Sequence, residues 1–410
     1  MMKQILCAVF LFSSCATYAL DQISGEQRYY SYLNAIENGA TKNLVVLDSQ
    51  DANLMVDALW TAQEEGMVPM RMRQSLRELS QDSLNLSDRL RLAVLRHRVR
   101  MNFKRRELGT AVVMGLASAT EGRLLALQII SLREDLAKMG LNHLVVAAKL
   151  IRPIDTQMSL AAEDQTIVDQ TQLAADLWNH TPDLTQWNNG RYSTGIRLYM
   201  FCRAKRQYPC LQVVRDIHHE PVRNADGTLW AHPALAKSRG DLPSNRVNGH
   251  TPTGVHTIDG VMPYADQIPS FGKHRRLILD FVPRSTNEQR HRDLLPESSQ
   301  ASNWWRPNVV ARDMGRKYFR IHGSGRASEE VTAPWHPFRP TSGCVAKREN
   351  TYDGVEYNDQ QELLNALMAA MDLEPKYENE TAIKGLMFFI ELDSKDAPVT
   401  MADLNAIGIQ

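Results

Sequence analysis

The sequence RIHGS at residues 320–324 is followed by TSGCV at residues 341–345, and these two stretches decide how the second half of the chain is interpreted. The first ends a strand-like apolar run and contains His322. The second contains Cys344 directly after a glycine. A thiol is a good nucleophile only as its thiolate, and a nearby imidazole can take its proton and later return one to a leaving group. The pattern predicts a catalytic pair.

Around this pair the sequence is typical of a mainly β domain. Strand-like runs are separated by clusters of proline, glycine and asparagine. One helix is expected at residues 359–371, because Asn358 can begin it and its leucines fall on one face. We therefore expect a catalytic domain at residues 190–395 and a C-terminal tail at residues 396–410. The expected strands are residues 195–201, 211–217, 254–258, 276–282, 318–322 and 386–392.

The first half of the chain has a different pattern. Apolar residues recur at steps of three or four between residues 24 and 180, which predicts an all-helical domain at residues 20–185. The expected fold is thus α+β and multidomain. Eight arginines and lysines lie between Arg89 and Arg106. We interpret this run as the solvated side of a helix in preference to a docking face for an acidic partner, although a periplasmic protein partner of the helical domain stays an open expectation.

The start of the chain resembles an export signal. Lys3 supplies a positive charge, residues 5–12 are apolar, and residues 17–19 suit cleavage after small side chains. We expect a signal peptide at residues 1–19 and a mature chain in the periplasm or cell envelope. A lipoprotein signal ending at Cys15 is the disfavoured alternative, and the apolar run is shorter than the roughly 20 residues of a membrane-spanning helix.

Composition and cysteine usage narrow the function. The 410 residues include 47 Lys+Arg and 47 Asp+Glu, so net charge does not indicate a nucleic-acid partner. After signal removal the cysteines are Cys202, Cys210 and Cys344. Cys202 and Cys210 flank a hairpin-like turn and are predicted to form a disulfide, with two buried thiols as the alternative. Cys344 stays free in both interpretations.

Three segments together resemble a known family. TPTGVHTI at residues 251–258, IHG at residues 321–323 and SGCV at residues 342–345 are similar, in this order, to motifs of the YkuD-type L,D-transpeptidase catalytic domain. The resemblance covers residues 190–395. It implies a YkuD-like β-sandwich or barrel, peptidoglycan stem peptides as substrate, and no cofactor.

The resemblance also implies roles for individual residues. Cys344 would be the nucleophile that forms a thioester at the diaminopimelate to D-alanine bond, and His322 the general base and acid. Gly323 would orient His322 through its backbone carbonyl, and the Gly343 backbone would stabilise the oxyanion. Transfer to an amine would make this a transpeptidase, and transfer to water an L,D-carboxypeptidase; both outcomes stay open.

Residues near the motif are candidates for substrate binding, and two positions depart from the family. The family has a second histidine where this chain has Ser342, and an arginine or asparagine where it has Ala346. These departures motivate an alternative of another class, a catalytically weakened peptidoglycan-binding or scaffold protein. No metal is expected, because His218-His219-Glu220 lacks helical ligand spacing. The substrate-binding candidates are Trp335, Arg339, Ser342, Lys347 and Arg348.

Overall fold

The computed structural model describes residues 49–64, 69–118, 122–150, 170–185, 192–246, 248–262, 271–281, 288–314 and 319–410, together with residues 32, 36 and 316. The predicted signal peptide, residues 1–19, lies outside the described residues. The chain divides into two compact units, each described by itself below. One comprises Met1–Leu125 and Arg133–Ala147, and the other Ala126–Leu132 and Ala148–Gln410.

The described residues before position 151 are helical, apart from the short connections between helices. Leu90, Val94 and Leu95 are fully buried, so apolar residues at helical spacing form the core there. In the described parts of the chain, no helix has the length and apolar character needed to cross a membrane. The helices are α2 (Ser49–Glu64), α3 (Pro69–Glu78), α4 (Leu86–Arg98), α5 (Arg105–Leu116), α6 (Gly122–Ser131), α7 (Arg133–Lys138) and α8 (Asn142–Lys149).

Two arginines of α4 make contacts inside the first unit. Arg91 pairs with Asp57, and Arg98 pairs with Asp135 at 3.0 Å. Both guanidinium groups lie over the ring of Trp60, at 5.2 and 4.8 Å from its centroid. The basic run is therefore not simply a solvated face, because these two side chains hold helices together.

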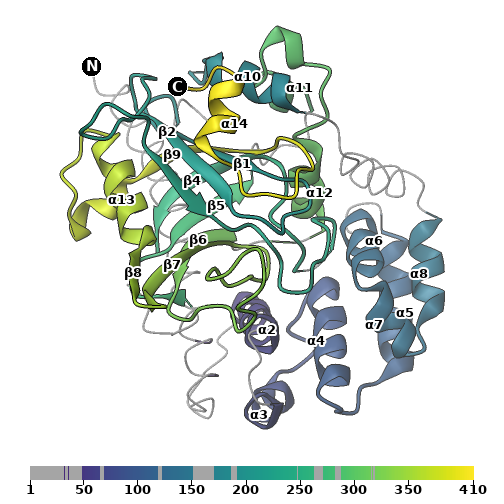
Figure 1. Cartoon of the computed structure of the whole chain (residues 1–410). Helices are drawn as coiled ribbons and strands as arrows, with labels where there is room; N and C mark the ends of the chain where they lie inside the picture. Colours follow the sequence, from purple (N-terminus) through teal and green to yellow (C-terminus); the bar gives the residue numbers. More distant parts are fainter. Residues whose placement is uncertain are drawn as a thin grey trace, which may run out of the picture. The chain divides into compact units, whose positions relative to one another are not determined.

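The second unit is built on one curled, mixed sheet (Figure 1). The nine strands assigned among the described residues have the order β3-β2-β1-β9-β4-β5-β6-β7-β8. Together with the helices this makes the chain α+β. The strands are β1 (Ile196–Cys202), β2 (Cys210–Arg215), β3 (Ala231–Ala234), β4 (Gly254–Val261), β5 (Leu277–Phe281), β6 (Phe319–Ser324), β7 (Val345–Tyr352), β8 (Val355–Asn358) and β9 (Lys384–Glu391).

Both faces of the central strands are covered. In β1, Leu198 and Met200 belong to one core, whereas Tyr199 and Phe201 belong to the other. This alternation explains why all seven residues of β1 are buried and why its sequence is apolar except for Arg197. The first core packs against α13 (Asp359–Ala369), and the second against α10 (Thr171–Asn179) and α14 (Met401–Ala406). The remaining helices of this unit are α11 (Glu288–Arg292) and α12 (Arg306–Asp313), with short 3₁₀ turns η4 (Glu297–Ser299) and η5 (Tyr377–Ala382).

The curl brings the two ends of the sheet together. Leu235, just after β3, exchanges backbone hydrogen bonds with Ala346 of β7, at 3.0 and 2.8 Å. Thr341 forms a second bridge with Ser238. The chain next to Cys344 is therefore paired on both sides, with β6 and with the segment after β3.

Two segments at the predicted domain limits belong to the sheet's core. Trp178 of α10 is 2% exposed and meets Tyr199 of β1 edge-on at 5.0 Å, so the helical region expected to reach residue 185 is shared between the units. Residues 396–410, expected to be a tail, contain α14 and bury Leu404 and Ile409. Arg203 fixes this segment, because it donates to Asp403 at 2.8 Å. The apolar face of a single helix does not reveal its packing partner, so the sequence did not show that α10 and α14 pack against the sheet.

Candidate active site

The register of the sheet places Cys344 at the start of the strand beside His322. β6 and β7 are parallel, with His322 opposite Ala346, and Cys344 directly precedes β7. Val345 faces the core with α13, and because side chains alternate along a strand, Ala346 and His322 share the opposite face. Cys344 lies two residues before Ala346, in the bend that leads into the strand. The fold thus brings the two segments that the sequence paired into adjacent strands.

A single hydrogen bond sets the tautomer of His322. Its Nδ1 lies 2.6 Å from the carbonyl oxygen of Gly323, the contact that the resemblance implied. A carbonyl only accepts, so Nδ1 carries the proton and Nε2 has the free lone pair. Phe271 meets the imidazole edge-on at 5.2 Å between ring centroids. The ring is therefore held from two sides with its basic nitrogen available.

The environment of His322 keeps the imidazole neutral. Burial lowers its pKa to about 4, the hydrogen bond to Gly323 raises it in part, and the positive charges of Arg276 and Arg320 lower it further. The side chain is only 3% exposed. At neutral pH His322 is thus an uncharged imidazole, the form that accepts a proton from a thiol.

The turn before Cys344 requires glycine. Gly343 has φ of +112°, a conformation that side-chain-bearing residues rarely adopt. A Cβ atom there would lie 2.4 Å from Nη2 of Arg316 and 2.8 Å from the carbonyl oxygen of Gly249. The hydroxyl of Thr341 donates to the carbonyl of Cys344 at 2.6 Å and accepts from the amide of Gly343 at 3.3 Å. To act as an oxyanion donor, that amide would have to leave Thr341.

Arg316 is a site residue that the sequence did not reveal. Its guanidinium donates to the carbonyl oxygens of Ser244, Gly249 and His250, all from one loop. Burial lowers the pKa of Arg316, and interaction with Cys344 raises it in part. A cation beside a thiol favours its thiolate form. Only the fold brings these residues together, since no spacing signal links residue 316 with residue 344.

The TPTG segment supports the turn of Cys344. Thr251 is fully buried and donates its hydroxyl proton to the carbonyl oxygen of Gly343 at 2.8 Å. Thr253 donates to the carbonyl oxygen of Trp304 at 3.0 Å, and the Trp304 side chain is buried in the core. The first and third motifs of the sequence thus meet at this turn, although 92 positions separate them.

The candidate substrate-binding residues fall into two groups. Trp335 is buried against Leu235, Phe338 and Ala346. It therefore lies on the face of the sheet that Ala346 of β7 shares with His322 of β6. Arg339 is half-buried in the same loop. Ser342 lies in the turn before Cys344. The hydroxyl oxygen of Ser342 is buried without a hydrogen-bond partner among the described residues.

Lys347 and Arg348 do not reach the site. Lys347 is fully buried, and its ammonium donates to Gln212 and to the carbonyl of Pro233, both at 2.8 Å. Alternation along β7 points it away from the face that Ala346 shares with His322. Arg348 binds the carboxylate of Asp359 at 2.7 Å. Both are occupied by contacts within the protein, because the strand that carries them is part of the sheet.

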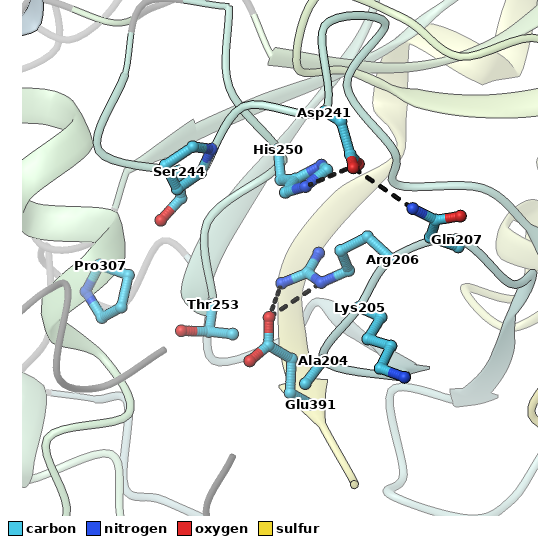
Figure 2. A pocket seen from close by; sticks show the side chains of 11 residues that line it. Ala204, Lys205, Arg206, Gln207, Asp241, Ser244, His250, Thr253, Pro307 and Glu391 are labelled. Atoms are coloured by element: carbon cyan, nitrogen blue, oxygen red, sulfur yellow. Dashed lines mark hydrogen bonds and ion pairs between the residues drawn. The ribbon is translucent and has the colours of Figure 1, made fainter. Parts of the chain in front are cut away.

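A cavity of about 320 Å³ lies beside the loop whose carbonyls bind Arg316 (Figure 2). Ser244 and His250, whose carbonyls bind Arg316, line it on one side. Arg206 and Glu391 line it on another and form an ion pair, with Nε of Arg206 at 2.9 Å from the carboxylate. Sequence reasoning did not find this cavity, because its lining comes from four distant parts of the chain.

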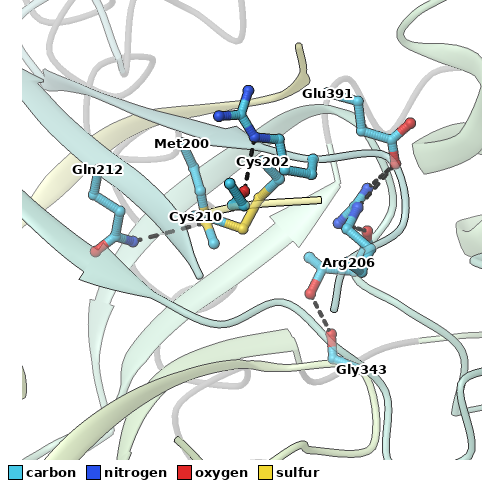
Figure 3. The surroundings of a disulfide bond; sticks show 10 residues. Met200, Cys202, Arg206, Cys210, Gln212, Gly343 and Glu391 are labelled. Carbon is cyan, nitrogen blue, oxygen red and sulfur yellow. Dashed lines mark hydrogen bonds and ion pairs between the residues drawn. A yellow bond between two sulfur atoms is a disulfide. The ribbon is translucent and has the colours of Figure 1, made fainter. Parts of the chain in front are cut away.

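The disulfide between Cys202 and Cys210 closes the turn that carries Arg206 (Figure 3). Arg206 also donates to the carbonyl oxygen of Thr251 at 3.1 Å. Since Thr251 holds Gly343, the turn is connected to the Cys344 site through two hydrogen bonds. The remaining described cysteine, Cys344, is not part of a disulfide and is half-buried.

One group of side chains has the donors for a metal ion. Ligand atoms of His232, Asp359 and Glu362 lie within 4.8 Å of one another. However, Arg348 already occupies both carboxylate oxygens of Asp359, at 2.7 and 3.2 Å. We assign no ion to this group.

Comparisons of the chain with family models, with curated proteins and with solved structures found no match. The site is therefore argued from its own residues.

Proposed function

We propose that this chain is a cysteine-dependent acyltransferase of the L,D-transpeptidase type, exported to the periplasm and acting on peptidoglycan stem peptides. The observation that carries the proposal is the parallel pairing of β6, which holds a neutral His322, with β7, which Cys344 directly precedes. The motif order and the contact between Thr251 and Gly343 support it. The proposal includes a YkuD-like character for the curled sheet.

The proposed chemistry uses the free lone pair of His322. Nε2 accepts the thiol proton of Cys344, and the thiolate attacks the carbonyl carbon of the diaminopimelate to D-alanine bond. Collapse of the tetrahedral intermediate breaks the C–N bond, and the imidazolium gives its proton to the departing amine. A second amine then attacks the thioester carbonyl and gives one proton to Nε2 of His322, and collapse of this intermediate forms a new amide and releases the thiolate. Water in place of that amine yields the carboxypeptidase outcome.

The positive charge of Arg316 supports the first step. It lies against Gly343 and interacts with Cys344, so it stabilises the thiolate before attack. It is also held rigidly by three backbone carbonyls. A fixed charge needs no reorganisation when the thiolate forms.

Mass spectrometry of the intact protein tests the proposal. Incubation with purified muropeptides should add one acyl group to the wild-type chain and none to Cys344→Ala. Product analysis then separates the outcomes, because dimers joined between two diaminopimelate residues indicate transpeptidation and tripeptides indicate hydrolysis. A wild-type protein that binds muropeptides but never forms the adduct would contradict the enzymatic proposal.

A second candidate is a peptidoglycan-binding protein without turnover. The observation that favours it is the engagement of the Gly343 amide by Thr341, which leaves that amide unavailable to an oxyanion. The serine at position 342, where the family has its second histidine, also favours this candidate. Binding that is unchanged in Cys344→Ala, without an adduct in the wild type, would establish this candidate.

A further inference from the structure

Glu349 of β7 is a buried acid that the proposed mechanism does not use. It is only 1% exposed. Burial raises the pKa of its carboxyl group, and hydrogen bonds from the backbone of Lys273 and His274 lower that pKa in part. Removing a carboxyl group from water costs free energy unless hydrogen bonds replace the lost hydration. The partners that replace it here come from a segment next to His322.

One contact of Glu349 is with the backbone that orients His322. β6 and β7 pair with Gly323 opposite Lys347, so Glu349 lies two residues beyond the partner of Gly323. A Cβ atom at position 323 would collide with Cδ and Oε1 of Glu349, and glycine is the residue that leaves this space open. The carbonyl oxygen of Gly323 is the acceptor for Nδ1 of His322 at 2.6 Å. The acid therefore packs against the residue whose carbonyl sets the tautomer.

A second contact of Glu349 is with residues 271–273, the Phe271 segment. Its Oε2 accepts a hydrogen bond from the backbone amide of Lys273. A Cβ atom at Gly272 would collide with the same oxygen, and it would lie 3.0 Å from the carbonyl carbon of Gly323. Phe271 directly precedes this glycine and meets the imidazole edge-on. The carboxyl group thus contacts both segments that hold the imidazole.

Glu349 does not share the face of the imidazole. Successive side chains of a strand point to opposite faces, so the space above Gly323 that Glu349 fills lies on the face away from His322. The charges that lower the pKa of His322 are those of Arg276, which precedes β5, and of Arg320 in β6. Any effect of Glu349 on the imidazole therefore passes through the backbone and the Phe271 segment.

We propose that Glu349 is a positioning residue that fixes the tautomer of His322 through the two segments that it contacts. The role rests on the proposed function, in which Nε2 of His322 accepts the thiol proton of Cys344. Without the carboxyl group, the Gly323 peptide unit and the Phe271 segment lose their common contact. The proton on Nδ1 then loses a well-aligned acceptor and moves in part to Nε2, where it blocks the basic nitrogen.

Nitrogen NMR of the histidine-labelled full chain at neutral pH tests this role, because protonated and unprotonated nitrogens of an imidazole differ in ¹⁵N shift. The signal of His322 is assigned by its loss in His322→Asn, and wild-type protein should carry the proton on Nδ1. In Glu349→Ala, the ratio of Nδ1–H to Nε2–H should fall at least about tenfold, the factor that corresponds to about 1.4 kcal/mol.

Acylation of Cys344 by purified muropeptides gives a second readout. A misplacement of about 1 Å can cost about a hundredfold in rate, so the saturating rate in Glu349→Ala should fall at least about tenfold. The muropeptide concentration at half-saturation should be unchanged, because Glu349 does not touch the substrate. Time-resolved mass spectrometry of the intact protein follows both quantities.

Conservative variants separate positioning from general loosening. Glu349→Gln keeps the side-chain length and an oxygen that can accept from Lys273, so it should restore the Nδ1–H tautomer that Glu349→Ala loses. Glu349→Asp withdraws the carboxyl group by one methylene and should shift both readouts in the same direction as Glu349→Ala, so it decides the outcome if the alanine variant does not fold.

Asn350→Gly is the matched control. Asn350 is the next residue of β7 and donates its side-chain amide to the carbonyl of Gly325 at 3.1 Å. Its φ of +72° suits glycine, so the variant should lose this bond without backbone strain. The bond supports the chain after β6 but reaches neither segment that holds the imidazole. Both the tautomer of His322 and the acylation rate should therefore stay at their wild-type values.

An unchanged tautomer in every folded variant that lacks or shortens the carboxyl group would overturn the proposal, as would an equal shift in Asn350→Gly. A proton on Nε2 in the wild type, or a shifted tautomer with an unchanged acylation rate, would overturn it as well. The proposed function fails separately. If wild-type Cys344 never forms an acyl adduct while the tautomer of His322 depends on Glu349, the acid positions the imidazole and only the proposed reaction is lost.

Discussion

At the scale of single residues, Gly343 carries the clearest constraint. Its positive φ and its contact with Arg316 leave no room for a side chain. The wall that binds Arg316 also lines the cavity, so displacement of the guanidinium would disturb both the turn and the cavity. A glycine at this position therefore allows both the conformation of the turn and the position of the Arg316 guanidinium beside the nucleophile.

We predict that Gly343→Ala is more destabilising than an alanine placed at another glycine with positive φ. Gly354 has φ of +78°, and no atom of the described residues lies within 4 Å of the place that a methyl group would take there. Gly354→Ala should therefore cost only the backbone strain of about 1–2 kcal/mol. Gly343→Ala should cost roughly 1–3 kcal/mol more, because Arg316 must move. Urea unfolding of both variants measures the difference, and equal costs would show that the contact is easily relieved.

The pKa of His322 predicts a dependence of stability on pH. Its folded value of about 4 lies below the ordinary value of 6.5, so the unfolded chain takes up this proton at higher pH than the folded chain. The resulting stability is present above pH 6.5 and is lost as the pH falls toward 4. At about 1.4 kcal/mol per pH unit, the histidine accounts for about 3 kcal/mol.

The variant His322→Asn should remove this contribution. An asparagine amide can still donate to Gly323, but it does not titrate in this range. The free energy of unfolding, measured by urea titration from pH 4 to pH 7, should rise less steeply in the variant than in the wild type. The buried His256, whose pKa is also lowered to about 4, leaves a residual slope in both proteins. Parallel curves would mean that folding does not lower the pKa of His322.

At the scale of elements, the TPTG segment contacts the turn before Cys344 through one hydroxyl group, that of Thr251. Thr251→Val removes the donor to Gly343, and Thr253→Val removes the donor to Trp304. Each leaves a buried carbonyl without its partner, so each should cost about 1–3 kcal/mol of stability. Only Thr251→Val should slow acylation of Cys344, as followed by time-resolved mass spectrometry. A similar slowing in Thr253→Val would assign the effect to general loosening of the segment.

Elements differed in how well their sequences predicted them. The sequence predicted six of the strands, with ends shifted by a few residues: β1, β2, β4, β5, β6 and β9. Their segments are apolar, rich in strand-forming residues and bounded by turns, which is typical of buried strands. The helix α13 was also predicted, although it ends two residues earlier than expected. These elements make the two cores.

β7 was missed, and with it the register of the site. Its sequence, VAKRENTY, is polar, yet Lys347 and Glu349 are buried. Hydrogen bonds to Gln212 and Pro233 make the burial of Lys347 possible, and both partners are distant in sequence. β3 was missed because Pro233 argues against a strand, although proline is tolerated at the edge of a sheet. The prediction that Cys344 acts with His322 therefore depended on the sequence motifs. The strand register next to the two residues could be read only from the fold.

At the scale of the whole molecule, α10 ties residues near the middle of the chain to the sheet. We predict that a chain of residues 170–410 is more stable than one of residues 186–410. The shorter chain lacks Leu173, Leu177 and Trp178, which are buried in the core beside β1. Each fully buried apolar side chain contributes about 1.5–3 kcal/mol, so the loss should reach several kcal/mol. Denaturant midpoints compare the two, and equal midpoints would show that α10 is dispensable for the sheet.

The position of β9 has a consequence for how the protein is made. This strand lies between β1 and β4, so it joins strands that are synthesised much earlier. Until residues 384–391 are available, β1 and β4 have no strand between them, and the pieces β1 to β3 and β4 to β8 meet only through the bridges of Leu235 with Ala346 and of Ser238 with Thr341. Cys344 is translated before that strand, and Glu391, which pairs with Arg206, comes at its end. An incomplete chain thus carries the thiol before the centre of the sheet is complete.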